Sequence, residues 1–209
     1  SLALVAAYPF MKRITWWPQA WLGLTFNWGA LMGFAAALSA LSSVAGLYGA
    51  ASSLCMWSTN TAPPPCAYEF AAPSLILLWP TALLLYVGGV FWTLGYDTVY
   101  ALQDIEDDAM VGVKSSARRL GAKVRPGVAA FYGLAAILAA CAGASAGLGP
   151  LFWIGFAAYA AHLAWQVRRL NGDNPALAPV LALAIFKSNR QAGLILLAAI
   201  VLGSLHFPS

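Results

Sequence analysis

Charged residues are scarce in this chain. Of its 209 residues only 7 are acidic and 11 are Lys or Arg, so that charged residues make up 9% of the sequence. Soluble domains typically carry about 25%, and the shortage therefore excludes a soluble globular core. Hydrophobic residues instead reach 61%, which is typical of a helical membrane protein.

Other features that the sequence lacks narrow the class further. It has no regular alternation of polar and apolar residues, which excludes a transmembrane β-barrel. Cysteine is rare: Cys55 and Cys66 share one loop, where either a disulfide or two idle thiols would fit, and Cys141 is expected to pack inside a span. No spacing is typical of a zinc site, and neither His162 nor His206 has a second metal ligand nearby in the sequence.

Long apolar segments are what the sequence does contain. Crossing a bilayer takes about 20 mostly apolar residues, and five segments qualify. They are residues 20–48, 75–95, 127–148, 152–167 and 191–205. We therefore predict an all-α fold, a polytopic transmembrane helical bundle that forms one domain over residues 1–209.

The first residues, "SLALVAAYPFMKR", read as the last turns of a further apolar helix that enters a basic edge. A signal peptide would carry its basic residues before the apolar stretch, not after it. We therefore expect about five complete spans plus the end of a sixth, and a chain that is truncated at its N-terminus.

The basic residues predict the orientation. Threading the five spans places all 11 Lys and Arg residues, including Lys187 and Arg190, on one side of the bilayer, which is the cytoplasmic side. The net charge of +4 then reflects orientation and contact with anionic headgroups, so no nucleic-acid partner is expected. No obligate protein partner is indicated. The Ala-rich composition favours a bacterial inner membrane, with a mitochondrial inner membrane as the alternative.

Five of the seven acidic residues lie together at residues 97–108. If one helix runs through this region, Asp97, Tyr100, Asp104 and Asp108 are spaced i, i+3, i+7 and i+11, so that the three aspartates share a face and Glu106 points away. Such a row repels itself unless cations hold it, and carboxylate oxygens suit Mg²⁺. A solvated helix end is the simpler interpretation. The position of Asp97 directly after an apolar run favours a functional site instead.

Two further features lie near the predicted membrane edge or within a span. Tyr8 and Lys12 are four residues apart and share a helix face, so they could together bind an anionic group, although ordinary membrane anchoring explains Lys12 equally well. Asn27 is an amide within a predicted span, for which a helix–helix hydrogen bond is the first interpretation and a substrate contact the second. Together these residues predict a cavity at the cytoplasmic edge that suits a lipid diphosphate.

The stretch "YDTVYALQDIEDDAMVGVKS" resembles the second aspartate-rich motif of the UbiA superfamily of intramembrane prenyltransferases, Asp-x-x-Tyr-Ala-x-x-Asp-x-x-x-Asp followed by Gly-x-Lys-Ser. The stretches "YPFMKR", "WPQAWLGLTFNWGALMG" and "FKSNRQAGL" resemble the branch that acts on 4-hydroxybenzoate. The resemblance implies Mg²⁺-dependent transfer of a polyprenyl group from polyprenyl diphosphate to the ring carbon ortho to the hydroxyl of 4-hydroxybenzoate, in ubiquinone biosynthesis.

The resemblance also implies roles for individual residues. Mg²⁺ and diphosphate would be held by Asp97, Asp104 and Asp108. The diphosphate would also be bound by Tyr8, Lys12 and Lys114, with Asn27 and Tyr100 as candidate substrate contacts. The family's first aspartate-rich motif, Asn-Asp-x-x-Asp-x-x-x-Asp, has no counterpart in these 209 residues. We therefore expect the chain to hold about half of the metal site and to be inactive alone.

Several alternatives stay open at this point. A prenyltransferase of the same family could use another acceptor, namely homogentisate, a naphthoate or haem. A CDP-alcohol phosphatidyltransferase would need Asp-Gly and Ala-Arg elements that are absent here. A transporter would place its ion site near the midplane on broken helices, whereas these aspartates follow the end of a span. A non-catalytic membrane remnant is the last alternative.

Overall fold

The computed structural model describes residues 2–40, 79–170 and 178–205, and all regular structure in these ranges is helical. The helices are α1 (Leu2–Ile14), α2 (Pro18–Phe26) with a helical continuation at residues 28–40, α4 (Trp79–Tyr100), α5 (Ile105–Met110), α6 (Ser116–Leu120), the 3₁₀ helix η2 (Gly121–Lys123), α7 (Val124–Ser145), α8 (Pro150–Arg169) and α9 (Ala178–Ser204). The predicted all-α class is confirmed. The loop that contains Cys55 and Cys66 lies outside the described residues.

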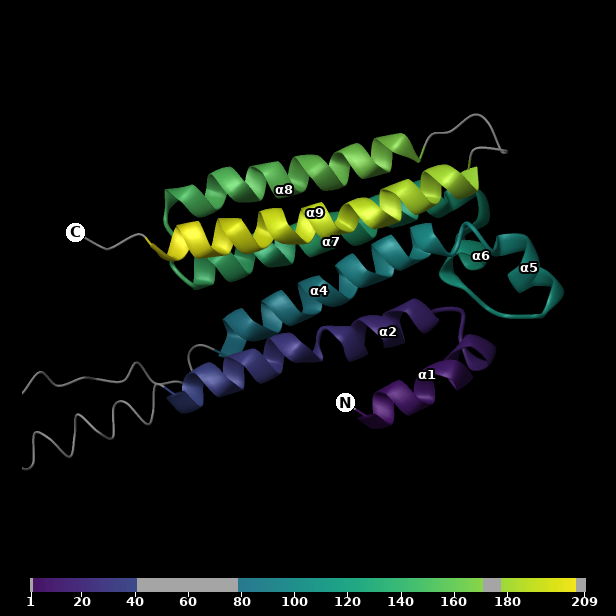
Figure 1. Cartoon of the computed structure of the whole chain (residues 1–209), viewed down its shortest axis with the longest axis horizontal. Helices are drawn as coiled ribbons and strands as arrows, with labels where there is room; N and C mark the ends of the chain where they lie inside the picture. Colours follow the sequence, from purple (N-terminus) through teal and green to yellow (C-terminus); the bar gives the residue numbers. More distant parts are fainter. Residues whose placement is uncertain (1, 41–78, 171–177, 206–209) are drawn as a thin grey trace, which may run out of the picture.

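The long helices run side by side in a bundle (Figure 1). Helix α9 packs against α8 and α4, α7 packs against α4 and α8, and α2 and then α1 follow on the other side of α4. The C-terminal ends of α1, α4 and α8 and the N-terminal ends of α2, α7 and α9 gather at one end of the molecule, together with α5 and α6. We call this the basic end, because Lys12, Arg118 and Arg169 lie there.

Four helical segments in the described ranges are long and apolar enough to cross a membrane, namely Pro18–Ala40, Trp79–Tyr100, Ser116–Ser145 and Pro179–Ser204. The remaining predicted span, residues 152–167, lies in α8, which has 20 residues but is not among the four. Large apolar side chains on the outside of the bundle, such as Leu194 (58% exposed) and Leu197 (57% exposed), have lipid as their natural surroundings. The chain is an integral membrane protein.

The interior is built where small residues let helices approach. On α7, Ala135, Ala139 and Ala142 are buried at spacings of four and three residues, which is one face of a helix. Gly95 on α4 lies directly against the ring of Tyr132 on α7. In lipid the hydrophobic effect does not drive helices together, so van der Waals contact between closely spaced backbones stabilises the bundle instead. Cys141, by contrast, is exposed on α7, so its predicted packing is wrong.

Helix α9 corrects another prediction. It begins at Ala178, so Lys187 and Arg190 lie inside the helix and not in a loop before it. Lys and Arg are good helix formers, and the apolar residues that precede them continue the helix toward its N-terminus. Phe186 packs against Tyr100, with ring centroids 4.8 Å apart, which places this part of α9 beside the last turn of α4.

Candidate functional site

The aspartate-rich segment is not one continuous helix, and this prediction was wrong. Helix α4 ends at Tyr100, the N–H of Leu102 donates to the carbonyl of Val99 at 3.2 Å, and that of Gln103 donates to the carbonyl of Tyr100 at 3.1 Å. These bonds reach back three residues where an α-helix reaches back four, so they form a tight turn. A new helix, α5, starts after Asp104.

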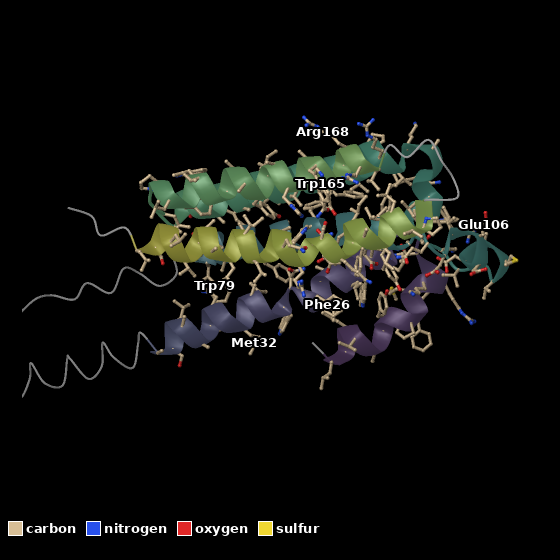
Figure 2. The ribbon with its side chains drawn as sticks, turned by 45° about the horizontal axis from the view of Figure 1, so that its top comes forward. Phe26, Met32, Trp79, Glu106, Trp165 and Arg168 are labelled. Carbon is tan, nitrogen blue, oxygen red and sulfur yellow. The ribbon has the colours of Figure 1, made fainter. Side chains whose placement is uncertain are left out.

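Helix electrostatics explain the break. Carboxylates are unfavourable at the C-terminus of a helix, where the carbonyl dipoles point outward, and favourable at an N-terminus. The turn moves the acidic run from the end of α4 to the start of α5, where Asp104 is the N-cap residue and Glu106, Asp107 and Asp108 occupy the first turn. Figure 2 shows Glu106 at the far tip of the molecule, beyond the ends of the long helices, in agreement with the prediction that it points away.

Arg118 holds the acidic segment against the rest of the basic end. Its Nη1 donates to the carbonyl oxygens of Asp108, at 3.1 Å, and Val113. Its guanidinium also lies over the ring of Trp16, with 5.7 Å between Cζ and the ring centroid. A planar guanidinium suits both contacts, since it offers a fork of donors and a flat face. Arg118 was not predicted. In the sequence, only its place in a basic run distinguishes it.

The residue predicted next to the diphosphate, Lys114, joins the segment to α1. Its backbone N–H donates to the carbonyl of Lys12 at 2.9 Å, and its ammonium donates to the carbonyl of Ile14 at 3.1 Å. The ammonium also lies 5.8 Å from the centroid of the Trp16 ring. Lys114 thus covers free carbonyls at the C-terminus of α1 and keeps a positive charge at the basic end.

Lys12 and Tyr8 lie close to the aspartates. The Lys12 ammonium interacts electrostatically with the carboxylates of both Asp97 and Asp108, and the Tyr8 hydroxyl interacts with the same two carboxylates. Lys12 also lies over the Tyr8 ring, with 5.6 Å from Nζ to the centroid, as expected for residues four apart on one face. The structure therefore brings together Tyr8, Lys12, Asp97 and Asp108, which we call the charged cluster.

Asp108 shows how its surroundings act on a carboxylate of the charged cluster. Partial burial raises the pKa of the Asp108 carboxyl above its ordinary value, and the negative charges of Asp104 and Asp107 add to this rise. Lys12 and Arg118 oppose it. Like charges that crowd in this way make the site attractive to a cation.

In the described ranges no three His, Cys, Asp or Glu side chains stand close enough to hold a metal ion among themselves. Asp97 and Asp108 are half-buried and Asp104 is exposed. This donor set fits Mg²⁺, because Mg²⁺ commonly takes only one or two protein carboxylates and completes its shell with water and substrate phosphates. Zinc, which favours nitrogen and sulfur ligands, fits less well.

A buried layer of hydrogen-bonded polar side chains joins the helices at the basic end. The Ser116 hydroxyl lies 2.6 Å from that of Thr98 on α4, and the Ser116 N–H donates to Oε1 of Gln19 on α2 at 3.2 Å. All three residues are buried. They tie α2, α4 and α6 together below the charged cluster, and sequence reasoning missed this role of Gln19 and Thr98.

A cavity of about 400 Å³ opens between α2, α4 and α9, and we call it the central cavity. Its aromatic walls are Phe26, Trp92, Tyr96 and Phe186. Its lining residue Tyr96 immediately precedes Asp97 of the charged cluster on α4. Its size is in the range of small-molecule sites.

Two amides line the central cavity and fix its walls. Asn27 donates to the Thr93 hydroxyl of α4 at 3.0 Å, so the predicted helix–helix hydrogen bond is confirmed, although the same side chain also lines the cavity. Asn189, only 8% exposed, accepts from Nε1 of Trp92 at 2.9 Å. Trp92 is therefore held in one orientation.

Two cations complete the lining of the central cavity, Lys187 and Arg190 of α9. The predicted span began at residue 191, after both of them, so their place in a cavity was missed. A second, mostly apolar cavity of about 200 Å³ shares Asn27 and Trp92 with the central one and continues along α4, α7 and α9. The two together provide a polar end and an apolar extension. Tyr100 lies outside the central cavity and packs on Phe186.

Comparisons with known proteins agree with this architecture. Residues 1–190 match the UbiA prenyltransferase family. The chain is similar to proteins named "4-hydroxybenzoate polyprenyltransferase, mitochondrial". It is 40% identical to that of Caenorhabditis elegans, and the match covers 98% of this chain and 46% of the relative. It is 38% identical to that of Arabidopsis thaliana, covering 97% of this chain and 40% of the relative, and 37% identical to that of Homo sapiens, covering 98% of this chain and 44% of the relative. No solved structure matches significantly.

The chain spans less than half the length of these three relatives. Its match to the family, by contrast, covers 190 of its own 209 residues. Five long helices, an acidic segment at one end of them and an intramembrane cavity are what the sequence resemblance implies. The chain belongs to the UbiA prenyltransferase family.

Proposed function

We propose that the chain carries the second half of the active site of a Mg²⁺-dependent enzyme that transfers a polyprenyl group from polyprenyl diphosphate to 4-hydroxybenzoate, in ubiquinone biosynthesis. One observation carries the proposal beyond the family: at the basic end, Lys12 interacts electrostatically with the carboxylates of both Asp97 and Asp108. Such a mixture of a cation and carboxylates suits a metal-bound diphosphate at the membrane edge. The printed names of the relatives support the acceptor.

The cations and the phenol of the basic end would bind the diphosphate. Lys12 is exposed and free to turn toward a phosphate oxygen, and Tyr8 can donate its hydroxyl to the same group. Lys114 is held by the Ile14 carbonyl, so it contributes charge from a fixed position. Preorganised positive charge of this kind stabilises a leaving group that becomes more negative as its bond breaks.

Mg²⁺ would be held by one or two of the carboxylates of Asp97, Asp104 and Asp108 together with water and diphosphate oxygens, and it would neutralise charge on the diphosphate. Asp97 is half-buried at the end of α4, whereas Asp104 is exposed. We infer that Asp97 marks the deepest position that the diphosphate reaches in the bundle.

The reaction exchanges one bond for another. The bond between the allylic carbon and the diphosphate oxygen breaks, and its electron pair leaves with the diphosphate. The ring carbon ortho to the hydroxyl of 4-hydroxybenzoate forms the new carbon–carbon bond, and the ring then loses its proton to a base or to water. The aromatic walls of the central cavity, Trp92 and Tyr96, offer π faces that favour a cationic carbon.

We also propose that the 209 residues are inactive alone and act within a longer protein. The support is that the chain spans less than half of the relatives' length and that the family's first aspartate-rich motif has no counterpart in it. The membrane would be an inner membrane. The composition suggests a bacterial one, whereas the names of the relatives support the mitochondrial alternative.

The test is a prenylation assay on membranes that contain one of two proteins. The first is the 209-residue chain, and the second is a chimera that adds, in native order, the part of the Caenorhabditis elegans relative outside the matched segment. We expect Mg²⁺-dependent prenylated 4-hydroxybenzoate, measured by mass spectrometry, from the chimera only. Homogentisate and a naphthoate serve as competing acceptors.

Asp97→Asn in the chimera is the site variant, and Glu106→Gln is its matched control because Glu106 points away from the charged cluster. We expect the first to lose product by about 100-fold or more and the second to keep it. Product from the 209-residue chain alone would refute the proposed inactivity. A chimera that prenylates homogentisate but not 4-hydroxybenzoate would refute the acceptor.

A further inference from the structure

Two positive charges lie within a helix that is long and apolar enough to span the membrane. Lys187 and Arg190 are the tenth and thirteenth residues of α9. In the part of the chain that the structure describes, neither has a carboxylate within 4.0 Å. Ionised side chains are costly at such positions and usually serve a ligand or a pathway. The function proposed above gives these two residues no role.

Lys187 and Arg190 face the same space. They are three residues apart, so they share a side of α9, and both line the central cavity. Both side chains are exposed, so they lie at the open rim of this cavity, while the buried Asn189 between them lines its inner part. The cavity therefore has a cationic rim on α9 and an aromatic interior.

The rest of the cavity suits a small aromatic ring. Trp92 and Tyr96 of α4 stand with ring centroids 6.1 Å apart, and Phe186 of α9 lies 5.7 Å from Tyr96. The Trp92 ring is fixed by its hydrogen bond to Asn189. Flat apolar walls with a few fixed polar groups are typical of sites for aromatic ligands.

We propose that Arg190, assisted by Lys187, binds the carboxylate of the aromatic acceptor, with its ring between the aromatic walls of the central cavity. This inference rests on the proposed function, because it names the subsite for the acceptor of that reaction. A guanidinium binds a carboxylate with two parallel hydrogen bonds, which also orients the ring. The hydroxyl end of the acceptor would then point toward Tyr96 and the charged cluster, where the allylic carbon is released.

Diphosphate is the other anion that such cations could bind, and the positions argue against it. The charged cluster is built from α1, α4 and α5, whereas Arg190 and Lys187 lie on α9. Arg190 is also one residue from Asn189, which bonds Trp92, so its level on the bundle is that of Trp92, more than one helical turn before Asp97. One anion site at each end of the cavity suits two substrates that react between them.

The experiment uses 4-azidobenzoate, which keeps the carboxylate and replaces the hydroxyl with a photoreactive azide. The 209-residue chain in lipid nanodiscs is irradiated with the probe, and labelled peptides are quantified by mass spectrometry. We expect labels on α4 or α9 that 4-hydroxybenzoate removes and that 4-hydroxybenzamide and inorganic diphosphate leave in place. No turnover is needed, so the result is independent of the prenylation assay.

Arg190→Gln should lower this labelling by about 10-fold to 100-fold, the range for loss of charge-assisted hydrogen bonds. Lys187→Gln should lower it less, and Arg190→Lys should restore part of it. Arg168→Gln is the matched control, since Arg168 lies on α8 and points away from the bundle (Figure 2). Each variant is first shown to be monodisperse in detergent.

Three results would overturn the subsite: no labelling of the unchanged chain, equal labelling of Arg190→Gln and Arg168→Gln, or displacement of the probe by diphosphate as effectively as by 4-hydroxybenzoate. Labelling as expected with no product from the chimera would instead count against the proposed function and leave an aromatic acid site standing. Product from the chimera with unchanged labelling of Arg190→Gln would support the proposed function and overturn the subsite.

Discussion

Gly95 is the position where the packing of α4 on α7 is easiest to test. A Cβ atom added there would lie 2.6 Å from Cδ1 of Tyr132 and closer still to Cε1, whereas ordinary contacts begin near 3.4 Å. Tyr132 is 2% exposed and cannot swing aside. Gly95→Ala should therefore push the two helices apart by roughly 1 Å, and overpacking of this kind costs about 1–3 kcal/mol in free energy of unfolding.

The same substitution should reach the charged cluster, because Asp97 lies two residues further along α4. A displacement of about 1 Å at a catalytic group can lower the rate about 100-fold. The free energy of unfolding would be measured by denaturant titration in detergent micelles, and the rate would be measured in the chimera described above. We expect Gly95→Ala to lower both the free energy of unfolding and the rate.

Gly133 provides the matched control for Gly95. It lies on α7 next to Tyr132, but a Cβ added there meets nothing within 4 Å. Gly133→Ala should therefore be neutral or slightly stabilising. The double variant Gly95→Ala with Tyr132→Leu should recover part of the lost stability, since the smaller side chain makes room. If Gly95→Ala and Gly133→Ala unfold at the same denaturant concentration, the close contact on which the reasoning depends is wrong.

Three further predictions concern single contacts. Tyr132→Phe removes a buried hydroxyl without a hydrogen-bond partner among the described residues, so denaturant titration should show equal or higher stability, by up to about 1 kcal/mol; a fall would contradict this. Arg118→Gln removes donors to carbonyls that include that of Asp108, so hydrogen exchange at residues 105–113 should speed up about tenfold or more while α7 stays protected. Asn27→Leu removes the bond to Thr93 and should cost about 1 kcal/mol by the same titration.

Much of the fold follows from the sequence because the bilayer leaves few options. Runs of apolar residues must be helices that satisfy their own backbone groups, so the positions of the long helices were predicted to within a few residues for α4 and α7. The boundaries of α9 were not predicted. A rule that places every charge at the end of a span is correct for Arg168 and Arg169, in the last turn of α8. It fails for Lys187 and Arg190, which line a cavity that the sequence alone does not reveal.

The candidate site was predicted by its residues more than by its geometry. Tyr8, Lys12, Asp97 and Asp108 were singled out, and the structure places them together. The supporting residues were missed, because contacts such as that of Gln19 with Ser116 join positions 97 residues apart and have no local pattern. Arg118 was missed for a related reason, since its partners are backbone carbonyls, which every residue has.

The break between α4 and α5 changes what the aspartates can do. On one straight helix Asp97 and Asp108 would be eleven residues apart, about 16 Å along the axis, which is too far for both to interact with one ammonium group or one diphosphate. With the tight turn at residues 101–104, α5 leaves the axis of α4, and Lys12 interacts with both carboxylates. The regular spacing of the motif therefore does not mark a helix face. It marks the end of one helix and the start of another, joined by a tight turn, and Lys12 interacts with a carboxylate on each side of that turn.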